Sequence, residues 1–174
     1  MLFFLDRASS CPTAQLNDDP NIPGSGQSLN VAGWGTSSLE ITGLSPTLQH
    51  VGLESMTNEE CRESSDTHIH RAHVCAKNEG KDSCWGDSGG PLILAGGGNN
   101  RTVPVQVGIV SWGAECAHAD FPGVYARIST AFDWIKNTAC ESFIDCDNKR
   151  CTKNNDCPTN SCDQFGMFEL KNNR

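Results

Sequence analysis

The chain has 174 residues, of which 37% are hydrophobic, and a formal net charge of −8. Its length and apolar content suit one packed domain, with or without a small appendage. The negative charge argues against nucleic acid or an anionic membrane surface as the main partner, and no apolar run reaches transmembrane length.

Short strands dominate the first third of the chain. Residues 1–28 predict a short apolar strand followed by a loop rich in Asn, Asp, Pro, Ser and Gly. Residues 29–35 (LNVAGWG) predict a strand that ends in a tryptophan between two glycines, and residues 48–56 predict another strand. Thr57 and Glu60 have the spacing of a capping box, which predicts a short helix there.

The remainder continues in strands and closes with a helix. Apolar residues alternate over 103–109, which predicts a strand with one buried face. Residues 124–128 predict a further strand. Ser129 or Thr130 is expected to cap a helix that carries Phe132, Trp134 and Ile135. Short strands, Gly/Pro turns and little helix together indicate an all-β barrel or sandwich.

The composition changes after residue 140. Segment 140–162 holds five cysteines within 23 residues and almost no aliphatic side chains, so disulfides rather than a core would have to stabilise it. We therefore expect a boundary near residue 140 and a cysteine-rich tail over 140–174.

Cysteine usage indicates an oxidising compartment. The ten cysteines predict disulfides and an extracellular or secretory location. Asn100-Arg101-Thr102 is a glycosylation acceptor. The apolar start, residues 1–5, is too short for the core of a signal peptide, so we expect that sequence is missing upstream.

Ser88 lies in a glycine-rich turn (GDSGG). The bare G-x-S-x-G pattern fits the nucleophile elbow of α/β-hydrolases, which needs a helix after the serine. Two glycines and Pro91 follow Ser88 and oppose a helix. The longer motifs are more specific: they are residues 31–35 (VAGWG), 82–91 (DSCWGDSGGP), 108–113 (GIVSWG), Cys116 and 122–125 (PGVY).

In this order the motifs resemble the trypsin-like serine proteases of the chymotrypsin family, from about residue 1 to 140. The resemblance implies the C-terminal antiparallel β-barrel of a two-barrel fold, with a closing C-terminal helix. Residues 1–28 would be a linker and the last strand of the first barrel, and residues 29–139 would be the second barrel and the helix.

The resemblance also implies the roles of the site residues. Ser88 matches the nucleophile, and the backbone N–H groups of Gly86 and Ser88 match the oxyanion hole. Asp82 matches the acid that selects Arg or Lys side chains. Expected substrate contacts are Ser83, the strand Ser111, Trp112 and Gly113, and the pocket walls Gly113 and Gly123.

The implied activity is a serine endopeptidase that cleaves protein or peptide substrates after Arg or Lys through an acyl-enzyme. No cofactor and no metal are expected. Two departures lie near the pocket: Glu115 stands where glycine is usual, and Trp85 stands where a polar residue is common. Either can change which substrate residues are accepted.

Family matching predicts the disulfides Cys61–Cys75 and Cys84–Cys116. A third family bridge would fall at Leu29 and Leu94, where an apolar pair stands instead. The pairing of the other cysteines stays open, because six allow fifteen combinations; they are Cys11, Cys140, Cys146, Cys151, Cys157 and Cys162. Our hypothesis is that Cys11 ties the N-terminal segment to the closing helix or the tail.

The catalytic histidine and aspartate of the family have no counterpart here. None of the five histidines follows alanine and precedes cysteine; they are His50, His68, His70, His73 and His118. His68, His70 and His73 are expected in a polar loop and lack further metal ligands at good spacing. The orienting aspartate would fall about two residues before Met1, so the first barrel is expected to be absent.

Two consequences are expected. Ser88 without a base is a weak nucleophile, so the chain as given should be inactive. Asp87 matches the carboxylate that pairs with the N-terminal amine formed on activation, and without that amine we expect a buried, unpaired charge.

Three interpretations stay open. The chain is the second half of a truncated trypsin-like protease, a non-catalytic homologue that binds or regulates, or a cysteine-rich adhesion or ligand-binding module on a barrel scaffold. Retention of both Ser88 and Asp82 favours the first of these.

Overall fold

The computed structural model describes residues 2, 14–37, 43–64, 68–94, 103–118 and 120–142. The strands are β1 (Gln15–Leu16), β2 (Ser28–Gly33), β3 (Gln49–Met56), β4 (His73–Lys77), β5 (Pro91–Leu94), β6 (Val105–Trp112) and β7 (Gly123–Arg127); the helices are α1 (Asn58–Ser64) and α2 (Ile128–Ser142). Apart from residue 2, the strand expected at residues 1–5 lies outside the described residues, as do the sequon at Asn100 and the tail beyond residue 142. Of the six cysteines whose pairing was left open, Cys140 lies in α2 and the other five lie outside the described residues.

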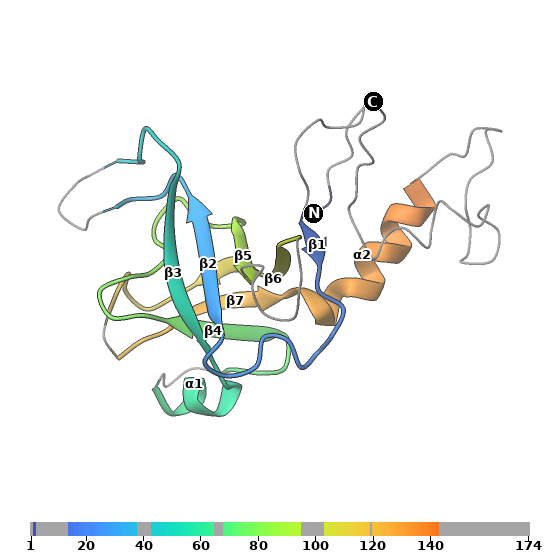
Figure 1. Ribbon diagram of the computed structural model, residues 1–174, viewed down its shortest axis with the longest axis horizontal. Helices are drawn as coiled ribbons and strands as arrows, with labels where there is room; N and C mark the ends of the chain where they lie inside the picture. The colour runs from blue at the N-terminus through green and yellow to red at the C-terminus, as the bar shows by residue number, and fades with distance from the viewer. Residues whose placement is uncertain are drawn as a thin grey trace.

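Six antiparallel strands close into a barrel in the order β6-β5-β2-β3-β4-β7, and β7 pairs back onto β6. The short strand β1 adds to the outer side of β6 in parallel, with Gln15 opposite Val105. Figure 1 shows α1 below the barrel and α2 leaving it beside β1. The predicted antiparallel barrel with a closing helix is therefore confirmed.

The interior of the barrel is filled by side chains that alternate inward along the strands. Fully or nearly fully buried residues come from β2, β3, β4, β5, β6 and β7; they are Leu29, Val31, Leu53, Val74, Ala76, Leu92, Val105, Val107, Val110 and Tyr125. Leu29 lies directly opposite Leu94 across the β2–β5 pair. The two leucines thus form the predicted apolar pair, and apolar burial stabilises the barrel there.

Helix α1 starts as predicted. The backbone N–H of Glu60 donates to Thr57 Oγ1 at 3.1 Å, and the backbone N–H of Thr57 donates to Glu60 Oε2 at 2.7 Å, which completes the capping box. The disulfide between Cys61 and Cys75 then links the helix to β4. A second small core forms around this bridge, with Ile69 and Val124 buried beside it.

The start of α2 corrects a prediction. The strand expected to run to Ile128 ends at Arg127, and α2 begins at Ile128. Ser129 and Thr130 therefore lie in the first helical turn and are not its cap; Thr130 Oγ1 donates to the carbonyl of Arg127 at 2.9 Å. Ile128 is buried, so its apolar side chain suited a strand or a helix equally well in the sequence.

Strand β4 corrects a second prediction. His73 was expected in a polar loop, but it begins β4 and lies opposite Ala126 of β7. The strand has polar residues at both ends and a buried apolar centre, Val74 to Ala76, so its sequence is not recognisable as a strand. Long-range pairing with β3 and β7 forms the strand here, rather than a local pattern.

Candidate active site

The turn that carries Ser88 contains two glycines with positive φ and is hydrogen-bonded to β6. Gly86 and Gly89 have φ values of 100° and 83°, a region that residues with a Cβ rarely adopt. The N–H of Gly89 donates to the carbonyl of Val110 at 3.0 Å, and the N–H of Val110 donates to the carbonyl of Gly90 at 2.9 Å. Ser88 is thereby held at the tip of the turn, exposed to solvent.

The backbone N–H groups of Gly86 and Ser88 have no protein acceptor within the part of the chain that the structure describes. A Cβ on Gly86 would collide with the side chain of Leu44 and approach Gly35 Cα at 3.2 Å. Only glycine fits here for two reasons, namely the positive φ and this close approach. Two N–H groups beside an exposed hydroxyl can stabilise negative charge on a bound carbonyl oxygen.

The end of β6 presents an exposed backbone edge beside this turn. Pairing of β6 with β5 stops at Pro91 opposite Ile109, and the register with β7 shifts between Val110 and Trp112. Ser111, Trp112 and Gly113 are exposed. An extended peptide can add to such an edge by main-chain hydrogen bonds.

Asp82 lies partly buried between the turn and the loop after β6. Its carboxylate accepts the N–H of Ser83 at 2.8 Å and the N–H of Ala117 at 3.2 Å. Burial raises the pKa of Asp82 above its ordinary value, while these two hydrogen bonds act in the opposite direction and the charge of Asp87 adds to the rise. A desolvated carboxylate of this kind has a strong electrostatic preference for a cation.

Gly123 faces Asp82, and Gly113 lies next to Gly123. A Cβ on Gly123 would lie 2.6 Å from Asp82 Oδ1, and a Cβ on Gly113 would lie 4.0 Å from Gly123 Cα. The hydroxyls of Ser83 and Tyr125 are 3.0 Å apart, and burial raises the pKa of Tyr125 well above its usual range. The structure thus brings Asp82, Ser83, Gly113 and Gly123 together. It adds Tyr125, which sequence reasoning placed in a motif without giving it a role.

Asp87 is better satisfied than the sequence predicted. Its carboxylate accepts the N–H of Gly35 at 2.7 Å and the N–H of Cys84 at 2.9 Å. The side chain also fills the space above Gly33 and Gly35, where a Cβ would collide with it. Asp87 is only partly buried, and backbone N–H groups from two segments stabilise its charge, although they do not supply the positive partner that the amine would provide.

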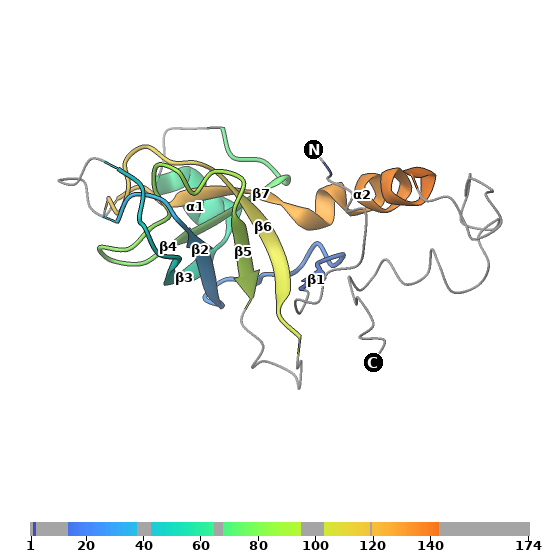
Figure 2. The ribbon, with the colours of Figure 1, turned by 90° about the horizontal axis from the view of Figure 1, so that it is seen from above.

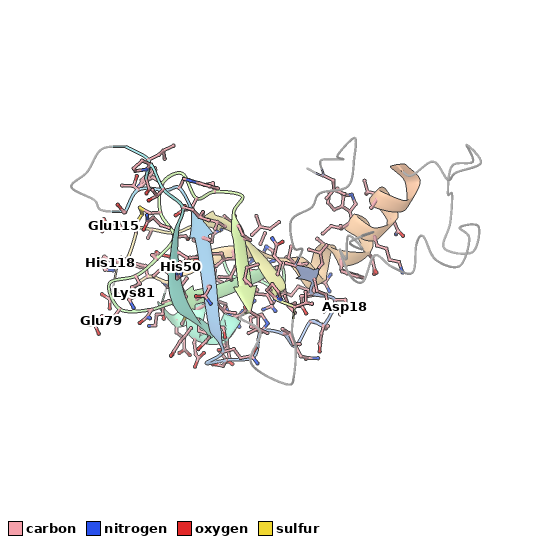
Figure 3. The ribbon with its side chains drawn as sticks, turned by 45° about the horizontal axis from the view of Figure 1, so that its top comes forward. Asp18, His50, Glu79, Lys81, Glu115 and His118 are labelled. Atoms are coloured by element: carbon pink, nitrogen blue, oxygen red, sulfur yellow. A yellow bond between two sulfur atoms is a disulfide. The ribbon has the colours of Figure 1, made fainter. Side chains whose placement is uncertain are left out.

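A cavity of about 380 Å³ adjoins both carboxylates, and its lining includes Asp82, Asp87, His50, Gly33 and Gly35. The predicted disulfide Cys84–Cys116 is present, and both cysteines line the same cavity. Figure 3 shows Lys81, Glu115 and His118 along one edge of the barrel, with His50 nearer its middle. Of these, Lys81 lines the cavity, where it brings a positive charge near the two carboxylates.

None of the five histidines, all of which the structure describes, hydrogen-bonds to Ser88. His118 stacks near Phe121 with ring centroids 4.8 Å apart. His70 lies 4.0 Å from the ring of His73, which in turn lies edge-on to Trp112 at 6.1 Å. Within the described ranges, no group of three His, Cys, Asp or Glu side chains is arranged to hold a metal ion.

Neither helix in the described part of the chain has the length and apolar character needed to cross a membrane.

The comparisons with known proteins agree on one family. The trypsin family profile matches residues 5–135. Trypsin alpha of Drosophila melanogaster is 38% identical over 120 residues, which covers 67% of this chain and 44% of that protein. Trypsin alpha-4 of Lucilia cuprina gives the same identity and the same coverage.

A solved structure gives the same result. The mouse brain serine protease neuropsin superposes with a TM-score of 0.63 at 33% identity, over 72% of this chain and 53% of that one. The chain spans 44% of the length of the curated relatives named above.

Proposed function

Because the chain belongs to the trypsin family of serine proteases, we propose that it supplies the nucleophile and the specificity pocket of an endopeptidase that cleaves proteins after Arg or Lys. One observation carries this proposal: the partly buried carboxylate of Asp82 faces Gly123, where a Cβ would come within 2.6 Å of Oδ1. Because Gly123 has no side chain, the carboxylate is left open to a long basic side chain of the substrate, whose charge would pair with Asp82.

The proposed reaction follows from the turn. Ser88 Oγ attacks the substrate carbonyl carbon while a base takes its proton, and the N–H groups of Gly86 and Ser88 stabilise the oxyanion. The C–N bond then breaks as the base returns the proton to the amine. Water hydrolyses the acyl-enzyme by the same steps and restores Ser88. The edge of Ser111 to Gly113 would hold the substrate backbone in register.

The base and its orienting carboxylate would come from a first barrel outside this chain, since none of the five histidines stands between alanine and cysteine as the family's catalytic histidine does. We propose that barrel as the obligatory partner of residues 29–139, with residues 1–28 as the connection and 140–174 as a cysteine-rich appendage. The two disulfides support a secreted protein.

Reactivity toward a fluorophosphonate probe tests this arrangement. The chain by itself is expected to label at Ser88 orders of magnitude more slowly than trypsin, because a serine without a base is a poor nucleophile. Labelling is expected to become fast when residues 1–174 are fused to the first barrel of a similar trypsin. Mass spectrometry of the labelled peptide identifies the modified serine. Fast labelling of the isolated chain would contradict the proposed need for a partner barrel, and a fused protein that never labels at Ser88 would contradict the catalytic role of Ser88.

Substitution of Gly123 tests the pocket without requiring catalysis. Gly123→Ala places a methyl group 2.6 Å from Asp82 Oδ1, so we expect the affinity for the flat cation benzamidinium to fall at least roughly 10-fold. Isothermal titration calorimetry on the isolated chain measures the change. Gly52→Ala is the matched control, because its Cβ would meet only Asn30 Oδ1, at 3.9 Å. Equal affinities of the two variants would contradict the pocket assignment.

A further inference from the structure

A second cavity, of about 510 Å³, lies where α2 begins, and its described lining consists of Pro20, Asn58, Arg71, Arg127 and Thr130. Figure 2 shows residues 68–72, just before β4, reaching the start of α2. The N–H of Arg127 donates to the carbonyl of Ala72 in that segment at 2.8 Å. None of the lining residues belongs to the site proposed above.

Arg127 is a partly buried cation with unused donors. Its Nε donates to the carbonyl of His73 at 3.2 Å, and its Nη1 donates to the carbonyls of Pro20 and Ile22 at 3.4 and 3.3 Å. Within the described residues the two N–H groups on Nη2 have no acceptor. Burial lowers the pKa of Arg127, because a desolvated guanidinium is less stable. A bound anion would compensate for this desolvation.

Arg71 brings a second guanidinium to the same cavity. Its side chain is exposed and makes no hydrogen bond with the residues described. The described lining contains no carboxylate, although acidic residues outnumber Lys and Arg by 21 to 13 in the whole chain. Two arginines without a facing acid, in an acidic protein, form a local positive field.

Asn58 adds an acceptor. Its Nδ2 donates to the carbonyl of His70 at 2.7 Å, while its Oδ1 is buried and has no partner among the described residues. A buried acceptor without a donor is destabilising. A hydroxyl on a ligand would satisfy it, whereas a bare anion would not.

We propose that this cavity binds a monosaccharide-sized anion, whose sulfate or carboxylate group faces Arg71 and Arg127 and whose neighbouring hydroxyl donates to Asn58 Oδ1. The cavity volume lies in the range of small-molecule sites. The planar guanidinium matches the paired oxygens of either anionic group. The proposal does not depend on the catalytic role of Ser88.

Calorimetry on the isolated chain at low ionic strength tests the site with three probes: glucose 6-sulfate, glucuronate and glucose. At least one anionic sugar is expected to bind saturably, and the tighter of the two identifies the anionic group that is preferred. Arg71→Gln is expected to weaken this binding at least roughly 10-fold. Lys77→Gln removes the same charge from the exposed end of β4 and is expected to change the affinity less than about twofold.

Asn58→Ala tests the hydroxyl contact separately. It should weaken binding of the anionic sugar but leave the affinity for inorganic sulfate unchanged. Circular dichroism checks that each variant is folded. Absence of saturable binding by both anionic sugars, equal binding of glucose, or an Arg71→Gln variant that binds like the parent would each overturn the proposal.

Discussion

Ser88→Ala is expected to lower the turnover of an arginine amide substrate by about a million-fold, in a fusion of residues 1–174 to the first barrel of a similar trypsin. The hydroxyl is the only group of the Ser88 side chain that can form the acyl-enzyme, and loss of a nucleophile in a comparable hydrolase has an effect of this size. The residual rate would come from the two backbone N–H groups of the oxyanion hole, which the substitution leaves in place. Steady-state kinetics with a chromogenic amide measures the loss.

Ser28→Ala is the matched control for this experiment. Ser28 is an exposed serine at the start of β2, and its substitution removes the same hydroxyl away from the turn. The control should retain the activity of the parent. A Ser88→Ala variant that keeps more than about a hundredth of the parent turnover would show that another group is the nucleophile.

Asp82→Asn is expected to reduce the preference for basic over neutral substrate residues by roughly 30- to 4,000-fold in kcat/KM. This range corresponds to about 2–5 kcal/mol for the removal of one partner from a buried charge pair. Asparagine preserves the shape of the side chain but removes its negative charge. That charge is partly desolvated, and it therefore favours a positively charged substrate side chain over a neutral one. Competition between an arginine substrate and its norleucine analogue measures the change. Glu115→Gln removes an exposed charge from the loop after β6 and should alter the ratio by less than about fivefold.

The same carboxylate should make cation binding depend on pH. Burial raises the pKa of Asp82 above the ordinary value of 3.8, so the carboxylate becomes protonated at a higher pH than an exposed aspartate does. The affinity for benzamidinium should therefore be constant at neutral pH and fall as the pH drops through this raised pKa. The Asp82→Asn variant should show weak binding without this dependence. A parent protein whose affinity does not change between pH 7 and the ordinary aspartate range would contradict a role for Asp82.

Much of the fold could be predicted because its signals are local. The capping box of Thr57 and Glu60 needs only residues three apart, and the structure contains both of its hydrogen bonds. Several motifs in a fixed order, from VAGWG to PGVY, predicted the family and with it two disulfides. Strand β4 was missed, because only its three central residues are buried and its two neighbouring strands come from distant parts of the chain.

The candidate site also combines features that the sequence predicts with features that only the fold determines. Sequence by itself determined which residue types stand at Ser88, Asp82 and Gly123, because a motif is a property of consecutive residues. The partners of Asp87 depended on the fold: the N–H groups of Gly35 and Cys84 are 52 and 3 residues away in the chain. Barrel closure brings β2 to the serine turn, and no local pattern records that distance.

The cavity lined by Arg71 and Arg127 depends most fully on the tertiary structure. Pro20, Asn58, Arg71 and Arg127 come from four separate segments, and no spacing in the sequence links them. They meet because β4 pairs with β7, which places the turn before β4 beside the start of α2. The sequence therefore determined the family and the chemical groups at the serine turn. Only the tertiary structure decided which charges meet, because Coulomb and hydrogen-bond energies depend on distances in space rather than along the chain.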